Sequence, residues 1–271
     1  MQSSKLDDAL LPVLKWAGGK RSLVEHILPH FSVSNGRYFE PFLGGAALFL
    51  ASGIRHARLS DLNEELINFY VQVRDRPLAL VKCMRVLNND EETYYAEREK
   101  GLKGVGLRKA ARFVFLTTLS FNGIYRQNLQ GVFNVPYGGR NRSQWFVDET
   151  IFAISERLQQ TELLTCDFES AVDSAKTGDL IYLDPPYTVA HSNNGFVKYN
   201  SKIFSWDDQI RLSAVAKSLV KRGCRVIVSN ADHDSIRCLY QGFREYKIVR
   251  ASVIAASADN RRRITESLFV S

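Results

Sequence analysis

A short apolar run at residues 180–183 ends directly in the sequence Asp184-Pro185-Pro186-Tyr187. The run predicts a buried strand, and the prolines end it, because each fixes its own φ and removes a backbone N–H. Each proline also forces the preceding residue into extended geometry. The Asp184 carboxylate and the Pro185 carbonyl are then fixed acceptors, and Tyr187 offers a ring for stacking. This pattern favours a rigid loop that binds a planar group carrying an NH2. The alternative is an ordinary turn in which Asp184 caps nearby N–H groups.

Strands and helices alternate on the C-terminal side of this loop. Residues 225–230 are apolar and β-branched, and residues 206–221, which precede them, have helical periodicity. Parallel strands joined by crossover helices are the natural arrangement for such a pattern. Further strands are expected at residues 161–168, 246–253 and 264–270. The sequence therefore predicts an α/β fold.

A glycine turn near the N-terminus predicts half of a nucleotide-binding βα unit. Residues 38–45 give a strand that ends in Gly44-Gly45, and a helix is expected from Ala46 to Ser52. A second strand, residues 57–63, carries Asp61 at its end, where Rossmann-like folds bind a ribose diol. The turn lacks the Gly-x-Gly-x-x-Gly pattern and the Walker lysine, which argues against a dinucleotide or triphosphate. An adenosine-like ligand is therefore expected here.

The middle of the chain departs from this alternation. A helix is expected over residues 63–87, and a second subdomain begins within the charged, glycine-interrupted residues 91–109. Residues 120–140 then alternate turn dipeptides, aromatics and arginine, which predicts a hairpin. We expect Tyr125 and Arg126 at exposed positions, where they stack on and hydrogen-bond to bases. The alternative is a structural hairpin whose aromatics close a small core.

The composition and net charge of the chain indicate which classes of partner to expect. The 271 residues carry a net charge of +7, which favours a polyanionic partner, and 45% of them are hydrophobic, enough for a large core. No apolar stretch is long enough to span a membrane and the first residues lack a signal-peptide pattern, so we expect a cytoplasmic protein. The four cysteines and five histidines show no zinc spacing and no disulfide framework, so no metal is expected. Arg261, Arg262 and Arg263 are expected in the connection before the last strand, as either a phosphate contact or a solvated charge run.

A loop for adenosine and a loop for an amino-bearing base belong together when a group is transferred between them. S-adenosylmethionine meets this requirement, because it carries adenosine and an activated methyl group and needs no metal. Acceptors at Asp184 and the Pro185 carbonyl would draw the amine of adenine toward a tetrahedral form and stabilise its developing positive charge. In a duplex the base must first leave the stack, and Tyr187 would receive its face.

Several ordered motifs over residues 14–270 resemble the Dam and DpnM type of DNA adenine methyltransferase, the D12 class or alpha group with an Asp-Pro-Pro-Tyr motif. Residues 14–20 are similar to the family's N-terminal motif, and residues 39–45 to its methionine-moiety loop. The resemblance implies a catalytic role for Asp184, Pro185, Pro186 and Tyr187. It implies cofactor contacts from Trp16, Lys20, Phe39, Glu40, Pro41, Gly44, Asp61 and Asp184.

Residues 122–138 resemble the family's target-recognition hairpin, in which the arginine matching Arg126 reads a guanine of GATC. The resemblance implies DNA contacts from Lys15, Asn122, Tyr125, Arg126, Asn134, Pro136 and Tyr137. Two departures stand out. Ala46 follows Gly44-Gly45 where many members have a further glycine, and Gly139-Arg140 occupies a place where Arg-Tyr-Lys is common.

The resemblance implies a Rossmann-like, S-adenosylmethionine-dependent methyltransferase sheet with an inserted, mostly helical target-recognition subdomain that carries a β-hairpin. The catalytic domain is expected at residues 1–75 and 156–271, and the DNA-binding insertion at residues 76–155. The expected reaction is site-specific methylation of the 6-amino group of adenine in double-stranded DNA by a protein that acts as a monomer. The alternatives are an RNA-adenine or protein-glutamine amide methyltransferase, and a non-catalytic DNA-binding regulator. A place in restriction-modification, genome maintenance or a phage is left open.

Overall fold

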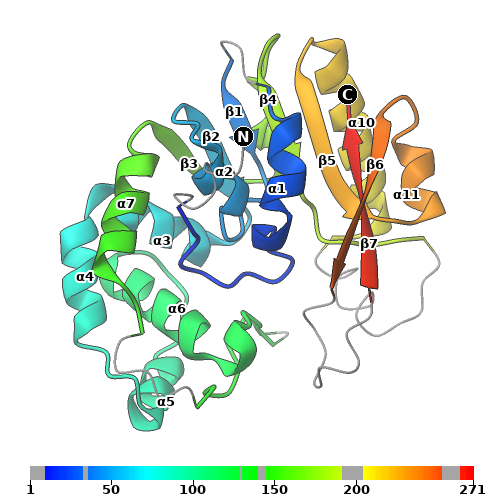
Figure 1. Cartoon of the computed structure of the whole chain (residues 1–271). Coiled ribbons are helices and arrows are strands. Elements are labelled where there is room, and N and C mark those ends of the chain that lie inside the picture. The colour runs from blue at the N-terminus through cyan, green and yellow to red at the C-terminus, as the bar shows by residue number, and fades with distance from the viewer. Residues whose placement is uncertain (1–9, 33–35, 129, 140–144, 191–203, 252–262) are drawn as a thin grey trace, which may run out of the picture. The chain divides into compact units, whose positions relative to one another are not determined.

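Seven strands form one sheet in the order β3-β2-β1-β4-β5-β7-β6. The computed structural model describes residues 10–32, 36–128, 130–139, 145–190, 204–251 and 263–271 (Figure 1). Packing divides the chain into two units. The first unit comprises Met1–Arg21, Leu43–His56 and Ser60–Cys166, and the second comprises Ser22–Phe42, Ala57–Leu59 and Asp167–Ser271. These units reflect packing alone, so the division into catalytic and recognition domains stays a prediction.

The centre of the sheet is parallel, which confirms the α/β fold expected from the sequence. Strand β1 pairs with β2 on one side and with β4 on the other, and β4 pairs in parallel with β5. Both β1 and β4 are buried along their whole length, as expected of central parallel strands covered on both faces. Their bounds are Tyr38–Glu40 for β1, Ala57–Asp61 for β2, Leu180–Leu183 for β4 and Arg225–Ala231 for β5.

The last two strands are antiparallel to their neighbours. Strand β7, Arg263–Val270, pairs with β5 on one side and with β6, Arg244–Ala251, on the other, so that the three lie side by side (Figure 1). The sequence placed Arg263 in a connection, which is wrong because its backbone pairs with Ala251 in the ladder. Arg261 and Arg262 lie outside the described residues.

Helix α10 of the second unit, Trp206–Lys221, has the bounds that its periodicity predicts. It begins with a capping box, in which the Ser205 side chain accepts from the Asp208 N–H and the Asp208 side chain accepts from the Ser205 N–H. The helix packs on β5 and on the short helix α8, Phe168–Ala171. Helix α11, Asp234–Leu239, follows β5.

The helices α3–α7 of the first unit pack against one another, most of them against more than one neighbour. The single helix expected over residues 63–87 is wrong, because Pro77 begins a new helix and Arg76 leaves helical geometry at φ −140°. Asn63 caps the earlier helix by accepting the Leu66 N–H. The bounds are Ala47–Ser52 for α2, Glu64–Asp75 for α3, Pro77–Arg85 for α4, Glu91–Glu99 for α5, Leu107–Leu119 for α6 and Asp148–Leu158 for α7; β3 is Thr161–Thr165.

Residues 21–30 form an irregular run of short turns. A 3-10 turn, Arg21–Leu23, leads into α1, Val24–Ile27, and a second 3-10 turn, Leu28–His30, contains Pro29. A proline lacks the N–H that a continuing helix requires, which accounts for the early end of α1. Across the described parts of the chain, no helix combines the length and apolar character needed to cross a bilayer.

Candidate active site

The loop after β4 is anchored by two fully buried carboxamides in the second unit. Gln209 on α10 donates from Nε2 to the Pro186 carbonyl oxygen at 3.1 Å. Asn230 on β5 donates from Nδ2 to the Gln209 Oε1 at 2.9 Å. Both carboxamide residues are 0% exposed, whereas Asp184 at the start of the loop is partly exposed and Pro185 is buried. The backbone of the Asp-Pro-Pro-Tyr loop is therefore fixed to a helix and to a neighbouring strand.

The ring of Tyr187 is held at its far end as well. Its hydroxyl donates to the Oε2 of Glu266 on β7 at 2.7 Å. Burial raises the pKa of Tyr187 well above its ordinary value, and the charges of Asp184 and Glu266 raise it further. The phenol consequently stays protonated at neutral pH and acts as a donor.

A second buried carboxylate of the same unit is Glu40 at the end of β1, which lies between the buried residues Phe39 and Pro41. Its Oε2 accepts from the Tyr38 hydroxyl at 3.0 Å. Burial, followed by the charge of Glu40, raises the pKa of Tyr38. Burial also raises the pKa of Tyr182, and its next cause is the charge of Asp184. These carboxylates create a negative field that favours a cationic group.

In the first unit the glycine loop is held by hydrogen bonds to both the N–H and the carbonyl oxygen of Gly44. The Gly44 N–H donates to Asp61 Oδ2 at 3.0 Å, and the Tyr70 hydroxyl donates to the Gly44 carbonyl oxygen at 3.2 Å. The other oxygen of Asp61 accepts the Asn63 N–H at 3.0 Å. Burial raises the pKa of Asp61 and these backbone bonds oppose the shift. A carboxylate oxygen accepts more than one hydrogen bond, so Asp61 can hold the loop and still accept from a ribose.

Trp16 covers this glycine. A Cβ at Gly44 would lie 2.6 Å from Cδ1 of Trp16, and Gly44 has φ +47°, so both space and backbone conformation require glycine. A Cβ at Gly45 would lie 3.4 Å from the Cβ of Trp16, an ordinary contact distance, so the requirement for glycine is confined to Gly44. Ala46, the departure from the family pattern, has φ +58°, a conformation that favours the glycine found in many members.

The two lysines of the N-terminal motif have different surroundings within the first unit. Lys20 is 5% exposed and donates from Nζ to the Gly18 carbonyl oxygen at 3.0 Å. Lys15 is exposed, and its side chain runs along Gly123, where an added Cβ would lie 2.8 Å from the lysine Cδ. Asn122, also exposed, has φ +57° at this turn. Lys15 and Asn122 are therefore brought to the base of the hairpin.

The hairpin expected in residues 120–140 is present. Gln127 and Phe133 form an antiparallel bridge, and the Asn134 N–H donates to the Arg126 carbonyl oxygen at 3.3 Å. Arg126 and Asn134 are both exposed, and the guanidinium Nε donates to Asn134 Oδ1 at 3.0 Å. Pro136 is exposed on the returning strand.

Tyr125 does not occupy the exposed position that we expected. It is half-buried, and its ring stacks on Trp16 with centroids 5.1 Å apart and an interplanar angle of 22°. The ring also contacts Phe113 and Phe133. Successive side chains of a strand point to opposite faces, so Tyr125 faces inward where Arg126 faces outward. The alternative, in which aromatics close a small core, describes Tyr125 and Phe133.

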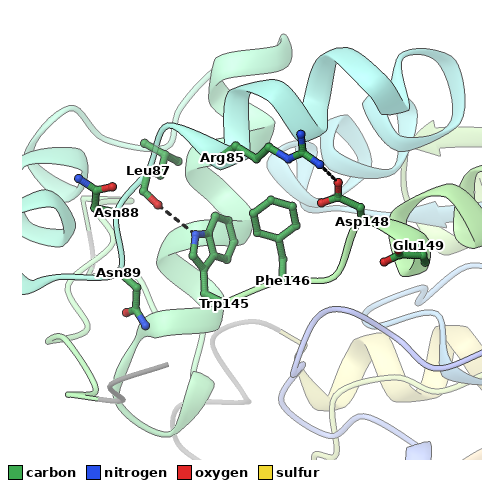
Figure 2. Close-up of a pocket in the computed structure, with 8 residues that line it drawn as sticks. All are labelled: Arg85, Leu87, Asn88, Asn89, Trp145, Phe146, Asp148 and Glu149. Atoms are coloured by element: carbon green, nitrogen blue, oxygen red, sulfur yellow. Dashed lines mark hydrogen bonds and ion pairs between the residues drawn. The ribbon is translucent and has the colours of Figure 1, made fainter. Parts of the chain in front are cut away.

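Tyr137 is likewise half-buried, and its hydroxyl donates to Asn89 Oδ1 at 2.8 Å. Asn89 lies on the rim of a hollow in the first unit (Figure 2). In this hollow Trp145 donates from Nε1 to the Leu87 carbonyl oxygen at 3.0 Å, and Arg85 forms an ion pair with Asp148. The hollow is lined by Arg85, Leu87, Asn88, Asn89, Trp145, Phe146, Asp148 and Glu149, none of which the sequence singled out.

Four residues that hold the site were missed by sequence reasoning: Tyr70, Gln209, Asn230 and Glu266. Glu266 left a readable signal, because a carboxylate within an apolar strand requires a partner. The partner itself, on the loop after β4, is visible only in the fold. Within the described ranges, no group of three His, Cys, Asp or Glu side chains is arranged to hold a metal ion.

Comparison with known proteins identifies the family. A model of the D12 class N6 adenine-specific DNA methyltransferases matches residues 16–254, most of the chain. The chain belongs to this family. Family membership makes DNA the substrate class and adenine the modified base, and it agrees with the resemblance drawn from the motifs.

Individual members of the family align along nearly the whole chain. The chain is 36% identical over 276 residues to Type II methyltransferase M1.LlaDCHI of Lactococcus lactis subsp. cremoris, covering 98% of this chain and 96% of that protein. It is 33% identical over 275 residues to Type II methyltransferase M.MjaIII of Methanocaldococcus jannaschii, covering 93% and 95%. It is 30% identical over 260 residues to the DNA adenine methylase of Escherichia coli K12, covering 94% and 93%.

Proposed function

We propose that this protein transfers the methyl group of S-adenosylmethionine to the 6-amino nitrogen of adenine within GATC in duplex DNA. The observation that carries the proposal is the anchored loop after β4, in which Asp184 follows a wholly buried strand and the Pro186 carbonyl is tied to Gln209. Positions fixed before the substrate arrives are what a group transfer with no covalent enzyme intermediate requires.

Asp184 and the Pro185 carbonyl act as acceptors for the two amine hydrogens. Their bonds draw the nitrogen lone pair out of conjugation with the ring and stabilise the positive charge that develops on nitrogen. Burial raises the pKa of Tyr182 and the charges of Asp184 and Glu40 raise it further, and this negative field acts in the same direction on the amine. Tyr187 receives the face of the extruded base.

The residues at the expected cofactor positions have a suitable chemistry. When bound, S-adenosylmethionine supplies an electrophilic methyl group on a sulfonium cation. Asp61 would accept from the ribose hydroxyls, and the carboxylate of Glu40 suits the positive end of the ligand. Trp16, Lys20, Phe39, Pro41 and Gly44 are the other positions that we assign to the cofactor from the family resemblance. The close approach of Trp16 to Gly44 supports this assignment, because two of the proposed cofactor residues are thereby in direct contact.

Specificity for GATC is assigned to Arg126 on the hairpin. Its Nε is bonded to Asn134 Oδ1, which supports the view that the guanidinium presents its two terminal nitrogens outward to guanine O6 and N7. Three exposed residues of the first unit would contact phosphate or sugar: Lys15, Asn122 and Pro136. Tyr125 and Tyr137 are half-buried, so their part in DNA binding is to support the hairpin.

The test is methyl transfer from labelled S-adenosylmethionine to matched duplexes that contain GATC, GTTC or GATG. Labelling confined to GATC, with protection of that duplex from a GATC-sensitive nuclease, is expected. Labelling of every adenine-containing duplex would overturn the specificity and leave the chemistry standing. Absence of label on all three duplexes would overturn the chemistry on duplex DNA. RNA and protein-glutamine substrates would then be assayed.

Two further proposals concern organisation. We assign the catalytic domain to residues 1–75 and 156–271 and the recognition insertion to residues 76–155. The protein is proposed to act as a monomer, which sedimentation of the enzyme on one GATC duplex would check.

A further inference from the structure

Glu266 is a buried acid whose place in the reaction the fold leaves unassigned. It is 3% exposed and lies inside β7, paired with Ala231 of β5 on one side and Ile248 of β6 on the other. Removing a carboxylate from water is costly unless hydrogen bonds compensate. Its retention at this position calls for a specific contact.

That contact is with the aromatic residue of the catalytic loop. The Tyr187 hydroxyl is 2.7 Å from Glu266 Oε2, a short distance typical of a bond to a charged acceptor. The raised pKa of Tyr187 keeps its proton in place, so the phenol donates at every physiological pH. The bond fixes the tip of the ring while the prolines fix its base.

The hydroxyl oxygen lies on the axis about which the ring turns, so the bond fixes the direction of that axis. Because a phenolic O–H stays close to the plane of its ring, an acceptor held in one place also favours one ring plane. Base stacking on an aromatic side chain is sensitive to that plane, and a ring that rotates must be ordered when the base arrives. Glu266 is too deeply buried on β7 to be a surface contact for DNA, and its bond to Tyr187 is the route by which it would act on the base.

We propose that Glu266 is a positioning residue that sets the plane of the Tyr187 ring for the extruded adenine. The proposal rests on the proposed function for the identity of the base. The claim that Glu266 orders the Tyr187 ring is independent of the proposed function, because ring order is measured in the protein without substrate.

The experiment compares the wild-type protein with Glu266→Gln, Glu266→Leu and Tyr187→Phe. The matched control is Tyr182→Phe, which also removes a buried tyrosine hydroxyl but breaks a bond to Ser229, 2.8 Å away and outside the loop. Two readouts are used. The first is kcat for methyl transfer on a GATC duplex, with the fluorescence of 2-aminopurine at the target position reporting extrusion and stacking. The second is the fluorine resonance of 3-fluorotyrosine placed at position 187 in the protein alone.

We expect Glu266→Leu to lower kcat about ten- to a hundredfold and to change the 2-aminopurine signal, since small misplacements of a reacting group have effects of this size. Glu266→Gln keeps an acceptor and should recover part of the loss. In a Tyr187→Phe background the Glu266 substitutions should have little further effect, because the hydroxyl through which Glu266 acts is gone. The Tyr182→Phe control should leave kcat and the fluorine resonance near wild type.

Three results would overturn the proposal: wild-type kcat and 2-aminopurine signal in both Glu266 variants, additive effects of Glu266→Leu and Tyr187→Phe, or an unchanged fluorine resonance at position 187. A wild-type protein that labels no duplex overturns the proposed function instead. In that case the fluorine resonance still decides whether Glu266 orders the ring.

Discussion

The hairpin that carries Arg126 and the loop after β4 are held in opposite ways. On the hairpin, Arg126 is bonded to Asn134 eight positions away, and both lie in solvent. In the loop after β4, Pro186 is bonded to Gln209 and Tyr187 to Glu266, which are 23 and 79 positions away and buried. Burial strengthens a hydrogen bond and makes its loss costly, whereas water substitutes for an exposed one. The comparison predicts that changes in the loop affect rate and stability, and that changes in the hairpin affect which sequence is methylated.

The largest effect is expected from Asp184→Asn. An amide at this position offers a weaker, neutral acceptor to the amine and no charge for the transition state, so kcat should fall by about 10² to 10³ or more. Single-turnover labelling of a GATC duplex measures this, and gel-shift binding of the same duplex should change little. Asp173→Asn is the control, because the exposed Asp173 carboxylate is bonded to Arg58 at the surface. A kcat equal to that of the wild type in Asp184→Asn would contradict the electrostatic role that we propose for the Asp184 carboxylate.

Gln209→Leu should give the next effect, on stability. The substitution keeps a side chain of similar size but takes the Gln209 bond from the Pro186 carbonyl and from Asn230 Nδ2. Buried groups that lose a partner destabilise a protein by about 1 to 3 kcal/mol each. Urea unfolding should therefore show a lower midpoint at an unchanged slope. An unfolding free energy within error of wild type would mean that the loop is not anchored through this carboxamide.

Arg126→Ala should leave the fold and the rate on saturating GATC largely intact and change discrimination. Loss of a bidentate contact to guanine costs about 1 to 3 kcal/mol of discrimination, or roughly ten- to a hundredfold in the ratio of kcat/KM between GATC and GATG. The control is Arg85→Ala, which removes a cation of the same unit whose partner is Asp148 and which lies on the hollow of Figure 2. Equal loss of discrimination in both variants would indicate a general charge effect instead.

The smallest effect belongs to Asn134→Ala. Because its bond to Arg126 is exposed, the free energy of unfolding should change by less than about 0.5 kcal/mol. Discrimination between GATC and GATG should fall by only a few-fold, since the guanidinium remains and merely loses its fixed plane. Measuring Asn134→Ala beside Gln209→Leu compares one exposed and one buried carboxamide that each hold a loop. A stability loss as large as that of Gln209→Leu would contradict the contrast between the two regions.

Local patterns were sufficient for most of the fold. Helix α10 has the predicted bounds because Ser205 and Asp208 form a capping box that is complete within four residues of sequence. Two errors were avoidable by local rules. A proline interrupts a continuing helix, so Pro77 predicts the break between α3 and α4. Successive side chains of a strand alternate between its faces, so Tyr125 and Arg126 cannot face the same side.

The support of the site was not predictable in this way. The motif residues Asp184 and Tyr187 are adjacent to signals that a sequence displays, namely a buried strand and two prolines. Gln209 and Glu266 acquire their roles only because α10 packs on β5 and because β7 enters the sheet antiparallel beside β5. A single sequence does not show which distant strand will supply the partner of a buried acid.

The distance of Glu266 along the chain has a consequence for biosynthesis. Tyr187 and its acceptor are separated by 79 positions, and the acceptor is in place only when β7 has paired with β5 and β6. A ribosome that has made the Asp-Pro-Pro-Tyr loop must still add the crossover helix and three strands before the ring is ordered. Nascent chains that stop short of β7 would therefore carry the whole Asp-Pro-Pro-Tyr motif with its tyrosine not yet held.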